Sequence, residues 1–165
     1  MELKLNGVIM SNVKKYKKGE NVKLSKNFHL KEWQCSCSDC EEVLVDLDHV
    51  LKLQQLREDL NASITITSAY RCPSHNAAVG GASHSQHKLG AATDLQVSGM
   101  SPDEVADACE KFNGLGRYNS FTHIDSRSTT KARWDKRTQK DYLPAEPTEI
   151  DIDISLDDIE KDLGL

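Results

Sequence analysis

Hydrophobic and polar residues follow two different periods in the central part of the chain. From Asp46 to Leu60 the apolar residues recur every three or four positions, which predicts an amphipathic helix with Asp46 as its N-cap. The stretch 62–70, ASITITSAY, is rich in β-branched residues and alternates, so it predicts a strand that ends at Tyr70. A glycine-rich loop follows, and the stretch 91–97, AATDLQV, predicts a second strand.

Two further segments complete the predicted order of elements. The stretch 101–114, SPDEVADACEKFNG, predicts a helix with a capping box between Ser101 and Glu104 and with Gly114 just past its end. The stretches GLGRY and FTHID then predict two short strands joined by a tight turn at Asn119–Ser120. Because helices and short strands mix in this order, we expect an α+β fold, with a small, mostly antiparallel sheet flanked by helices.

Charge is spread unevenly and suggests three parts. The net charge is −5, yet the segment from Glu146 to Leu165 alone contains eight acidic residues and one lysine, and lysines dominate the first 24 residues. We therefore expect a basic N-terminal arm over 1–24, one central domain over 25–140 and an acidic tail over 141–165. Such charge runs are usually solvated extensions. The alternative is that the tail docks on a partner or that the arm attracts an anionic polymer.

The cysteines and the hydropathy indicate the kind of compartment in which the protein is found. Cys35, Cys37 and Cys40 lie in the short run CSCSDC, and Cys72 is the one obvious fourth ligand for a structural zinc site. Free thiols in a reducing compartment are the preferred interpretation, because the five cysteines form no even disulfide set. The sequence contains no apolar run of membrane-spanning length. The first residues show no apolar stretch followed by a cleavage site, so no secretory signal is expected.

Three residues form a candidate metal site. His87 and Asp94 lie seven positions apart across Gly90, and His123 lies on another predicted strand. Two imidazoles and one carboxylate suit zinc, and three protein ligands leave one coordination position open for water. Such a site suits amide hydrolysis, because zinc lowers the pKa of water and polarises a carbonyl group. His84, three residues before His87, is the alternative ligand on spacing alone.

The residues around this site resemble a known family. The segment Ser85–Asp94, SQHKLGAATD, matches the motif Ser-x-His-x-x-Gly-x-Ala-x-Asp of the M15 zinc peptidases, the D-alanyl-D-alanine carboxypeptidases and related cell-wall endopeptidases. The resemblance extends from ITSAYRCPSHNAAVGGAS through GLGRYNSFTHID to KARW, over roughly residues 25–135. It implies a small α+β fold with one zinc ion per chain, held by His87, Asp94 and His123.

The resemblance also suggests roles for neighbouring residues. Arg71 matches the arginine that faces the substrate carbonyl or carboxylate, and Ser85 matches a serine that supports the site by hydrogen bonding. Many relatives place an acidic general base where this chain has Ser120. This chain instead has Asp125, two residues after His123, as in the His-x-Asp branch of the family. Asp125 then acts either as the general base or as the group that orients His123.

The function expected from this resemblance is zinc-dependent hydrolysis of peptide bonds in peptidoglycan stem peptides, by carboxypeptidase or endopeptidase action. A phage lysis enzyme or a virion-associated hydrolase fits, located in the host cytoplasm before release or on the virion and acting on the cell wall. The acidic tail could then dock on other virion proteins, and no nucleic-acid partner is expected. The alternative is a peptidase-derived structural or binding module of a phage particle, without turnover.

Overall fold

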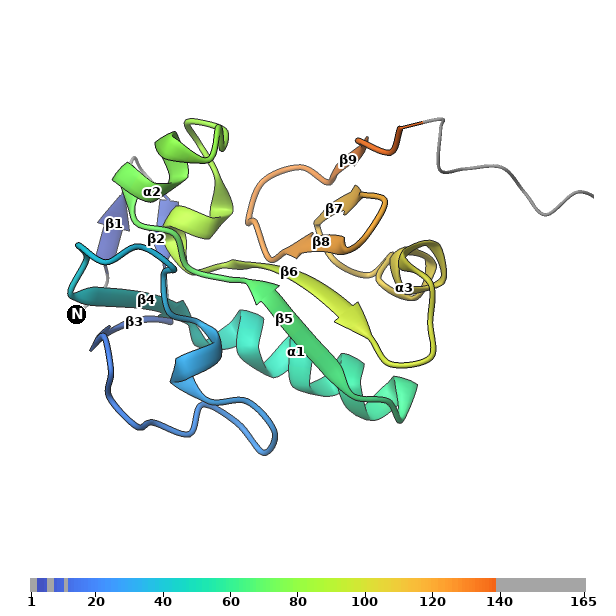
Figure 1. Cartoon of the computed structure of the whole chain (residues 1–165), viewed down its shortest axis with the longest axis horizontal. Coiled ribbons are helices and arrows are strands. Elements are labelled where there is room, and N and C mark those ends of the chain that lie inside the picture. Colours follow the sequence, from blue (N-terminus) through green and yellow to red (C-terminus); the bar gives the residue numbers. More distant parts are fainter. Residues whose placement is uncertain (1–2, 6–7, 11, 139–165) are drawn as a thin grey trace, which may run out of the picture.

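A five-stranded sheet forms the centre of the computed structural model, which describes residues 3–5, 8–10 and 12–138 (Figure 1). Neighbouring strands are antiparallel except β7 and β9, which are parallel. In spatial order the strands are β5 (Ile64–Ser68), β6 (Ala92–Val97), β8 (Thr122–Asp125), β7 (Gly114–Arg117) and β9 (Ala132–Asp135). The α+β fold with a mostly antiparallel sheet is thus confirmed.

Helices and two small sheets surround this central sheet. The helices are α1 (Leu47–Leu60), α2 (Pro73–Ala78) and α3 (Pro102–Ala108), with 3-10 turns η1 (Leu30–Glu32) and η2 (Gln86–Leu89). The small sheets are antiparallel pairs, β1 (Leu3–Leu5) with β2 (Val8–Met10) and β3 (Val13–Lys17) with β4 (Glu42–Asp46). β3 lies within the lysine-rich segment 1–24, so this part of the predicted arm contributes a strand to the fold. The acidic tail lies outside the described residues.

Helix α1 supplies much of the core. Its residues Val50, Leu53 and Leu56 are buried in one cluster with Leu95 of β6 and Ile124 of β8. Figure 1 shows α1 running beside β5 and β6. Burying such aliphatic side chains contributes about 1.5 to 3 kcal/mol each, so this contact is a major source of stability.

The N-terminus of α1 matches the sequence prediction. The Asp46 carboxylate accepts hydrogen bonds from the backbone N–H groups of Asp48 and His49, as an N-cap should. The His49 side chain, which the sequence leaves without a role at the site, is fully buried and hydrogen-bonds Thr93 and Ser126. Burial lowers the pKa of His49 to about 3, so this imidazole is neutral and structural.

Helix α3 is shorter than predicted. Its capping box between Ser101 and Glu104 is present, but the helix ends at Ala108, well before Gly114. The chain turns at Cys109, whose N–H bonds the carbonyls of both Val105 and Ala106, and this turn lets Cys109 itself enter the core. Gly114 is therefore the first residue of β7 and not a helix terminator.

None of the helices within the described part of the chain is long and apolar enough to cross a membrane. This agrees with the hydropathy of the sequence.

One glycine fixes the turn between η2 and β6. Gly90 has a φ of 70°, and a Cβ atom at this position would collide with the carbonyl oxygen of Leu44 in β4. Gly90 also accepts a hydrogen bond from the Asp46 N–H at 3.1 Å, so the turn is held tightly against β4. Glycine is therefore required here for two reasons: it adopts a positive φ without strain, and it has no Cβ atom to collide with Leu44.

We expect Gly90→Ala to destabilise the protein more than Gly19→Ala does. Gly19 has a φ of 89° but nothing within 4 Å of an added Cβ atom, so its substitution costs only the left-handed conformation, about 1 to 2 kcal/mol. Gly90→Ala adds the collision with Leu44. Denaturant unfolding measures both variants, and equal losses of unfolding free energy would show that the contact with β4 is unimportant.

Candidate metal centre

The register of two central strands brings Asp94 and His123 together. In the antiparallel pair β6–β8, Asp94 lies directly opposite His123, so both side chains point from the same face of the sheet. Their alternating neighbours Leu95 and Ile124 are buried in the hydrophobic core. The sequence places these two residues 29 positions apart, and the sheet reduces the distance from Asp94 Oδ1 to His123 Nδ1 to 2.8 Å.

His87 reaches the same point from η2. Ser85 is the N-cap of this turn and accepts a hydrogen bond from the His87 N–H at 3.3 Å, while Gly90 ends it in a left-handed conformation. His87 Nε2 lies 3.2 Å from both Asp94 Oδ1 and His123 Nδ1. Ser85 therefore sits where the sequence expects a supporting hydrogen-bond acceptor, and the turn at Gly90 returns the chain to β6.

The protonation pattern of the two imidazoles fits a metal. His87 Nδ1 lies 2.6 Å from the carbonyl oxygen of Ala69, which can only accept, so this nitrogen carries the proton. His123 Nε2 likewise faces the carboxylate of Asp125 at 3.2 Å. The nitrogens that remain, His87 Nε2 and His123 Nδ1, then present lone pairs to one another and to Asp94. Three such acceptors in contact repel one another unless a further proton or a metal ion lies among them, and a metal ion can bind all three.

The donor set and its size suit zinc. The three ligand atoms lie 2.8 to 3.2 Å apart, and a tetrahedral ion bonded at about 2.0 to 2.1 Å separates its ligands by about 3.3 Å. All three residues are buried, so most of each side chain is already held in place by the protein around it. Zinc with three protein ligands keeps a coordination position open, which is typical of a catalytic site.

Asp125 lies next to His123, and both of its carboxylate oxygens accept hydrogen bonds. One carboxylate oxygen contacts His123 Nε2 and, at 2.5 Å, the Arg127 guanidinium. The other oxygen accepts from the backbone N–H and from Nε of Arg127, at 3.1 and 2.7 Å. The Asp125 side chain is completely buried. This geometry matches a group that orients a metal-binding imidazole through its far nitrogen.

The pKa shifts of Asp125 and Asp94 also indicate that both carboxylates stay ionised at neutral pH. Burial alone would raise the pKa of Asp125, but the hydrogen bonds from Arg127 and His123 outweigh burial and hold that pKa well below its ordinary value. For Asp94, burial is likewise outweighed when the facing imidazoles of His123 and His87 carry protons, and its pKa is lowered. A metal ion among the three side chains would take the place of those protons. A carboxylate that resists protonation is poorly matched to general-base catalysis at neutral pH, so Asp125 suits a positioning role better.

Arg71 lies at the edge of the same constellation. Its Nη2 atom donates to Asp94 Oδ2 at 2.5 Å and its Nε donates to Ser68 Oγ at 2.9 Å. Nη1 has no hydrogen-bond partner among the residues described, and Arg71 lines the cavity in front of the metal site. Arg71 thus holds the second oxygen of Asp94 and keeps one donor group for a ligand in the cavity.

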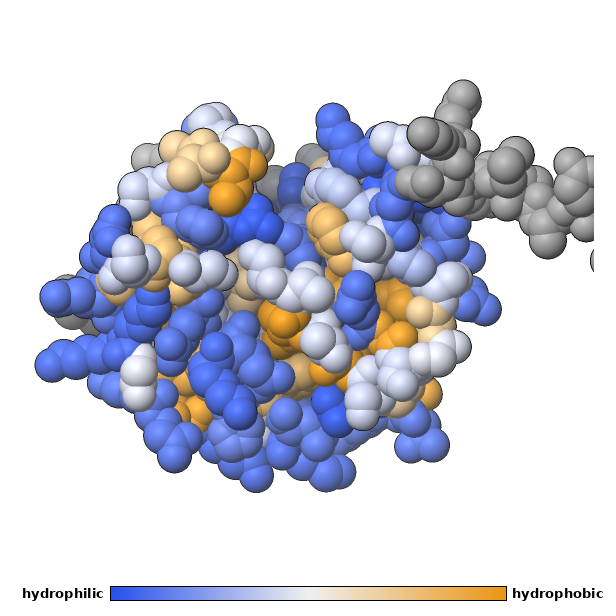
Figure 2. Space-filling view, in the orientation of Figure 1, coloured by the Kyte–Doolittle hydropathy of each residue, from blue (hydrophilic) through white to orange (hydrophobic). Residues whose placement is uncertain are grey.

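A cavity of about 780 Å³ opens in front of the three candidate ligands. The space-filling view shows a notch between the α2 side and the β7–β9 side of the molecule (Figure 2). His84, the alternative ligand, lines this cavity but is exposed and lies outside the buried group of three. Ser120 does not line the cavity, and its carbonyl oxygen accepts from Gln96 Nε2 at 2.7 Å.

Sequence reasoning missed several residues that shape this site. Gly114 and Gly116 lie opposite Asp125 and His123 on β7, and a Cβ atom would collide with the Asp125 carboxylate at Gly114 or with the Trp134 ring at Gly116. The Trp134 ring packs 5.0 Å from the His123 ring. The spacing Gly-x-Gly opposite His-x-Asp is the signal that could have revealed this arrangement.

Comparison with known families agrees with this geometry. A family model described as Peptidase M15 matches residues 26–125, which include all three candidate ligands. The chain therefore belongs to the Peptidase M15 family, whose members are peptidases and generally depend on zinc. A search of curated proteins found no match.

We expect His87→Ala to remove one bound zinc ion per chain, because its Nε2 atom is one of the three converging donors. His84→Ala is the matched control, since it removes a neighbouring, exposed imidazole that also lines the cavity. Metal analysis after equilibration with zinc gives the difference from the unmodified protein. Loss of zinc in His84→Ala but not in His87→Ala would reverse the ligand assignment.

We expect Asp125→Asn to weaken zinc binding about 10- to 100-fold, with activity recovering at high zinc, because Asp125 orients His123. Asp135→Asn is the control, since Asp135 at the end of β9 pairs with Arg137 two residues later in the same way but contacts no candidate ligand. Competition with a chelator measures affinity. A loss of turnover of about 100-fold with zinc affinity unchanged would instead make Asp125 the general base.

Proposed function

We propose that this protein is a zinc-dependent peptidase that cleaves peptide bonds in the stem peptides of bacterial peptidoglycan. The observation that carries the proposal is the buried group of His87, Asp94 and His123 at the base of an open cavity. When bound there, zinc supplies a Lewis acid for the scissile carbonyl and lowers the pKa of water. Membership of the Peptidase M15 family supports the reaction class.

The walls of the cavity favour a peptide that carries negative charge. Three cationic residues, Arg71, Arg127 and Lys136, line it against two carboxylates, so the lining carries one net positive charge although Arg71 and Arg127 pair with those carboxylates. Peptidoglycan stem peptides carry free carboxylates, so these cations would attract them and orient them near the metal site. The Nη1 group of Arg71 is placed to donate a hydrogen bond to a substrate carbonyl or carboxylate.

Apolar side chains supply a second set of contacts. Tyr118 and Phe121 stack with ring centroids 4.3 Å apart, and Tyr118 Oη accepts a hydrogen bond from Trp134 Nε1 at 3.1 Å. Val79, which is 52% exposed, also lines the cavity. This combination of a few fixed polar groups and apolar walls is typical of a site for a small organic or peptide ligand.

A binding module without turnover is the second candidate function. Asp94 and Asp125 are the only carboxylates among the described residues that line the cavity, and both are committed to ligand or positioning contacts. A peptidase also needs a group that transfers protons to the leaving amine. In the described lining, the exposed His84 offers an imidazole for this purpose. The phage-associated setting and the docking of the acidic tail on virion proteins remain predictions from the sequence.

We expect the full chain to release stem-peptide fragments from purified peptidoglycan, to lose this activity with a chelator and to regain it with zinc. Mass spectrometry of the fragments identifies the bond and separates carboxypeptidase from endopeptidase action. His87→Ala is the inactive control. Because the cavity is cationic, peptides with amidated carboxylates should be cleaved more slowly than the free acids.

A protein that binds zinc at the three ligands and binds peptidoglycan, yet releases no fragment, would establish the binding module instead. Cleavage that persists after complete removal of zinc would contradict both candidates.

A further inference from the structure

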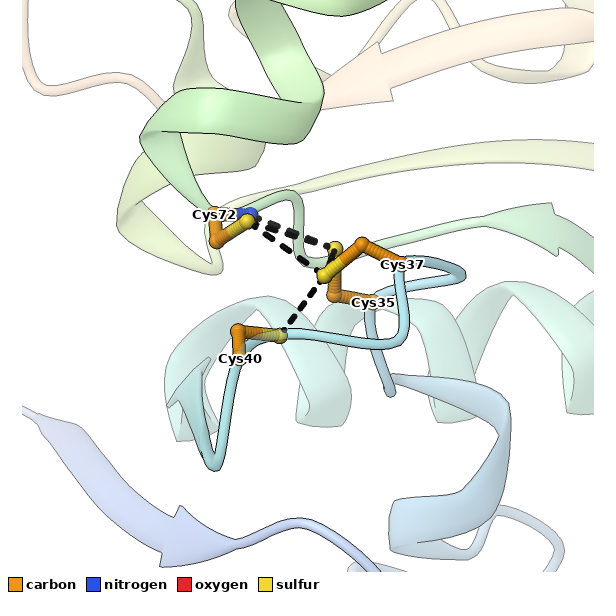
Figure 3. Close-up of side chains that lie close together, drawn as sticks. All are labelled: Cys35, Cys37, Cys40 and Cys72. Atoms are coloured by element: carbon orange, nitrogen blue, oxygen red, sulfur yellow. Dashed lines mark hydrogen bonds between the residues drawn. The ribbon is translucent and has the colours of Figure 1, made fainter.

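Four cysteines from two segments far apart in the sequence meet in a second cluster, separate from the three candidate ligands His87, Asp94 and His123. Cys35, Cys37 and Cys40 lie on the loop between η1 and β4, and Cys72 directly precedes α2. Figure 3 shows all four sulfur atoms turned toward a common point, with three side chains contributed by the loop and one by the chain entering α2. All four sulfur atoms lie within 4.8 Å of one another.

The spacing of the sulfur atoms matches a single tetrahedral metal ion. The neighbouring Sγ–Sγ distances are 3.1 Å for Cys37–Cys40, 3.4 Å for Cys35–Cys37, 3.5 Å for Cys37–Cys72 and 3.8 Å for Cys35–Cys72. Zinc bound at about 2.3 Å from each sulfur separates its ligands by about 3.8 Å. A disulfide bond requires about 2.05 Å, and an iron–sulfur cluster inserts several atoms between its cysteines.

Backbone groups around the cluster are arranged to stabilise thiolates. The N–H of Cys72 donates to Cys35 Sγ, and the N–H of His75 donates to Cys72 Sγ, each at 3.4 Å. The ammonium group of Lys18 donates to the carbonyl oxygen of Cys37 and so places a positive charge beside the loop. Hydrogen bonds to the ligating sulfur and a nearby cation both favour the negative charge of a metal–thiolate site.

The loop that carries three of the four cysteines has little regular structure. Residues 33–41 form no helix or strand, and Ser36, Ser38, Asp39 and Glu41 are exposed, so the loop has few apolar contacts of its own. Besides the cysteines, its links to the rest of the fold include the buried Trp33, whose carbonyl accepts from the Tyr70 N–H at 3.1 Å. Lys18 also donates to the loop, through its backbone N–H to the Glu41 carbonyl at 2.7 Å and through its ammonium group to the Cys37 carbonyl. A tetrahedral crosslink would fix such a loop far more firmly than weak thiol hydrogen bonds.

We propose that Cys35, Cys37, Cys40 and Cys72 bind one structural zinc ion, separate from the ion held by His87, Asp94 and His123. Four protein ligands close the coordination sphere, so this ion has no open position and serves structure and not catalysis. The geometry thus favours the alternative that the sequence analysis placed second to free thiols. With both sites filled, the protein carries roughly two zinc ions per chain.

The second ion would also stabilise the catalytic site. Cys72 follows Arg71, whose N–H donates to the His87 carbonyl at 3.1 Å and whose side chain holds Asp94. Fixing Cys72 therefore fixes the backbone that carries Arg71. This link is structural, so the zinc site of the cysteines can be tested without any measurement of peptidase activity.

Metal analysis of the full chain tests the proposal. The unmodified protein should hold roughly two zinc ions, His87→Ala one, Cys40→Ser one and the double variant none. Cys40 is chosen because it is only partly buried, and Cys109→Ala is the control, since Cys109 is a buried free thiol outside the cluster. Zinc content unchanged by Cys40→Ser would overturn the proposal.

Cobalt substitution provides a second measurement in case Cys40→Ser folds poorly. In His87→Ala, which keeps all four cysteines, cobalt should give the strong ultraviolet absorption of cobalt–thiolate bonds and the intense visible bands of tetrahedral coordination. Absence of these bands, an intact mass that shows a disulfide, or iron in place of zinc would each contradict a structural zinc site. The outcome is independent of the proposed function, because a protein without peptidase activity could still show the thiolate signature.

Discussion

The antiparallel pairing of β6 with β8 is the constraint on which the candidate metal centre depends. It sets Asp94 opposite His123 and, on the next pair of the same face, Ala92 opposite Asp125. Because side chains alternate along a strand, a slip of either strand by one residue would turn its ligand into the core and expose its apolar neighbour, Leu95 on β6 or Ile124 on β8. The hydrophobic contacts of α1 with the other face therefore also hold the metal ligands in place.

Most of the fold that positions the site could be predicted from local sequence patterns. Helix α1, strands β5 to β8 and the capping box of α3 follow from periodicity and from residues such as Asp46 and Ser101, whose effects act within a few positions. The pairing of β3 with β4 could not be predicted, because VKKYK carries charge on most positions and its partner is 29 residues away. The end of α3 was missed because the burial of Cys109 is a tertiary effect.

The three candidate ligands could be predicted from the sequence, whereas the residues that contact them or surround the site could be predicted less well. His87, Asp94 and His123 stand out by residue type and motif, whereas the partner of Asp125 depends on where β8 ends. Arg127 lies two residues past that end and folds back, so its three contacts with Asp125 appear only in three dimensions. The same holds for Cys72. It lies near the other three cysteines only because the chain that leaves β5 passes beside their loop.

The two glycines of β7 determine which strand forms the part of the cavity wall beside them. Since Gly114 and Gly116 place no side chain on the cavity face, this part of the wall comes from the next strand, where Trp134 covers His123. β9 carries no candidate ligand and joins the sheet only at its edge. Substitutions on β9 could therefore change what the cavity accepts while the strands that hold the metal stay the same, which separates substrate choice from metal binding in this fold.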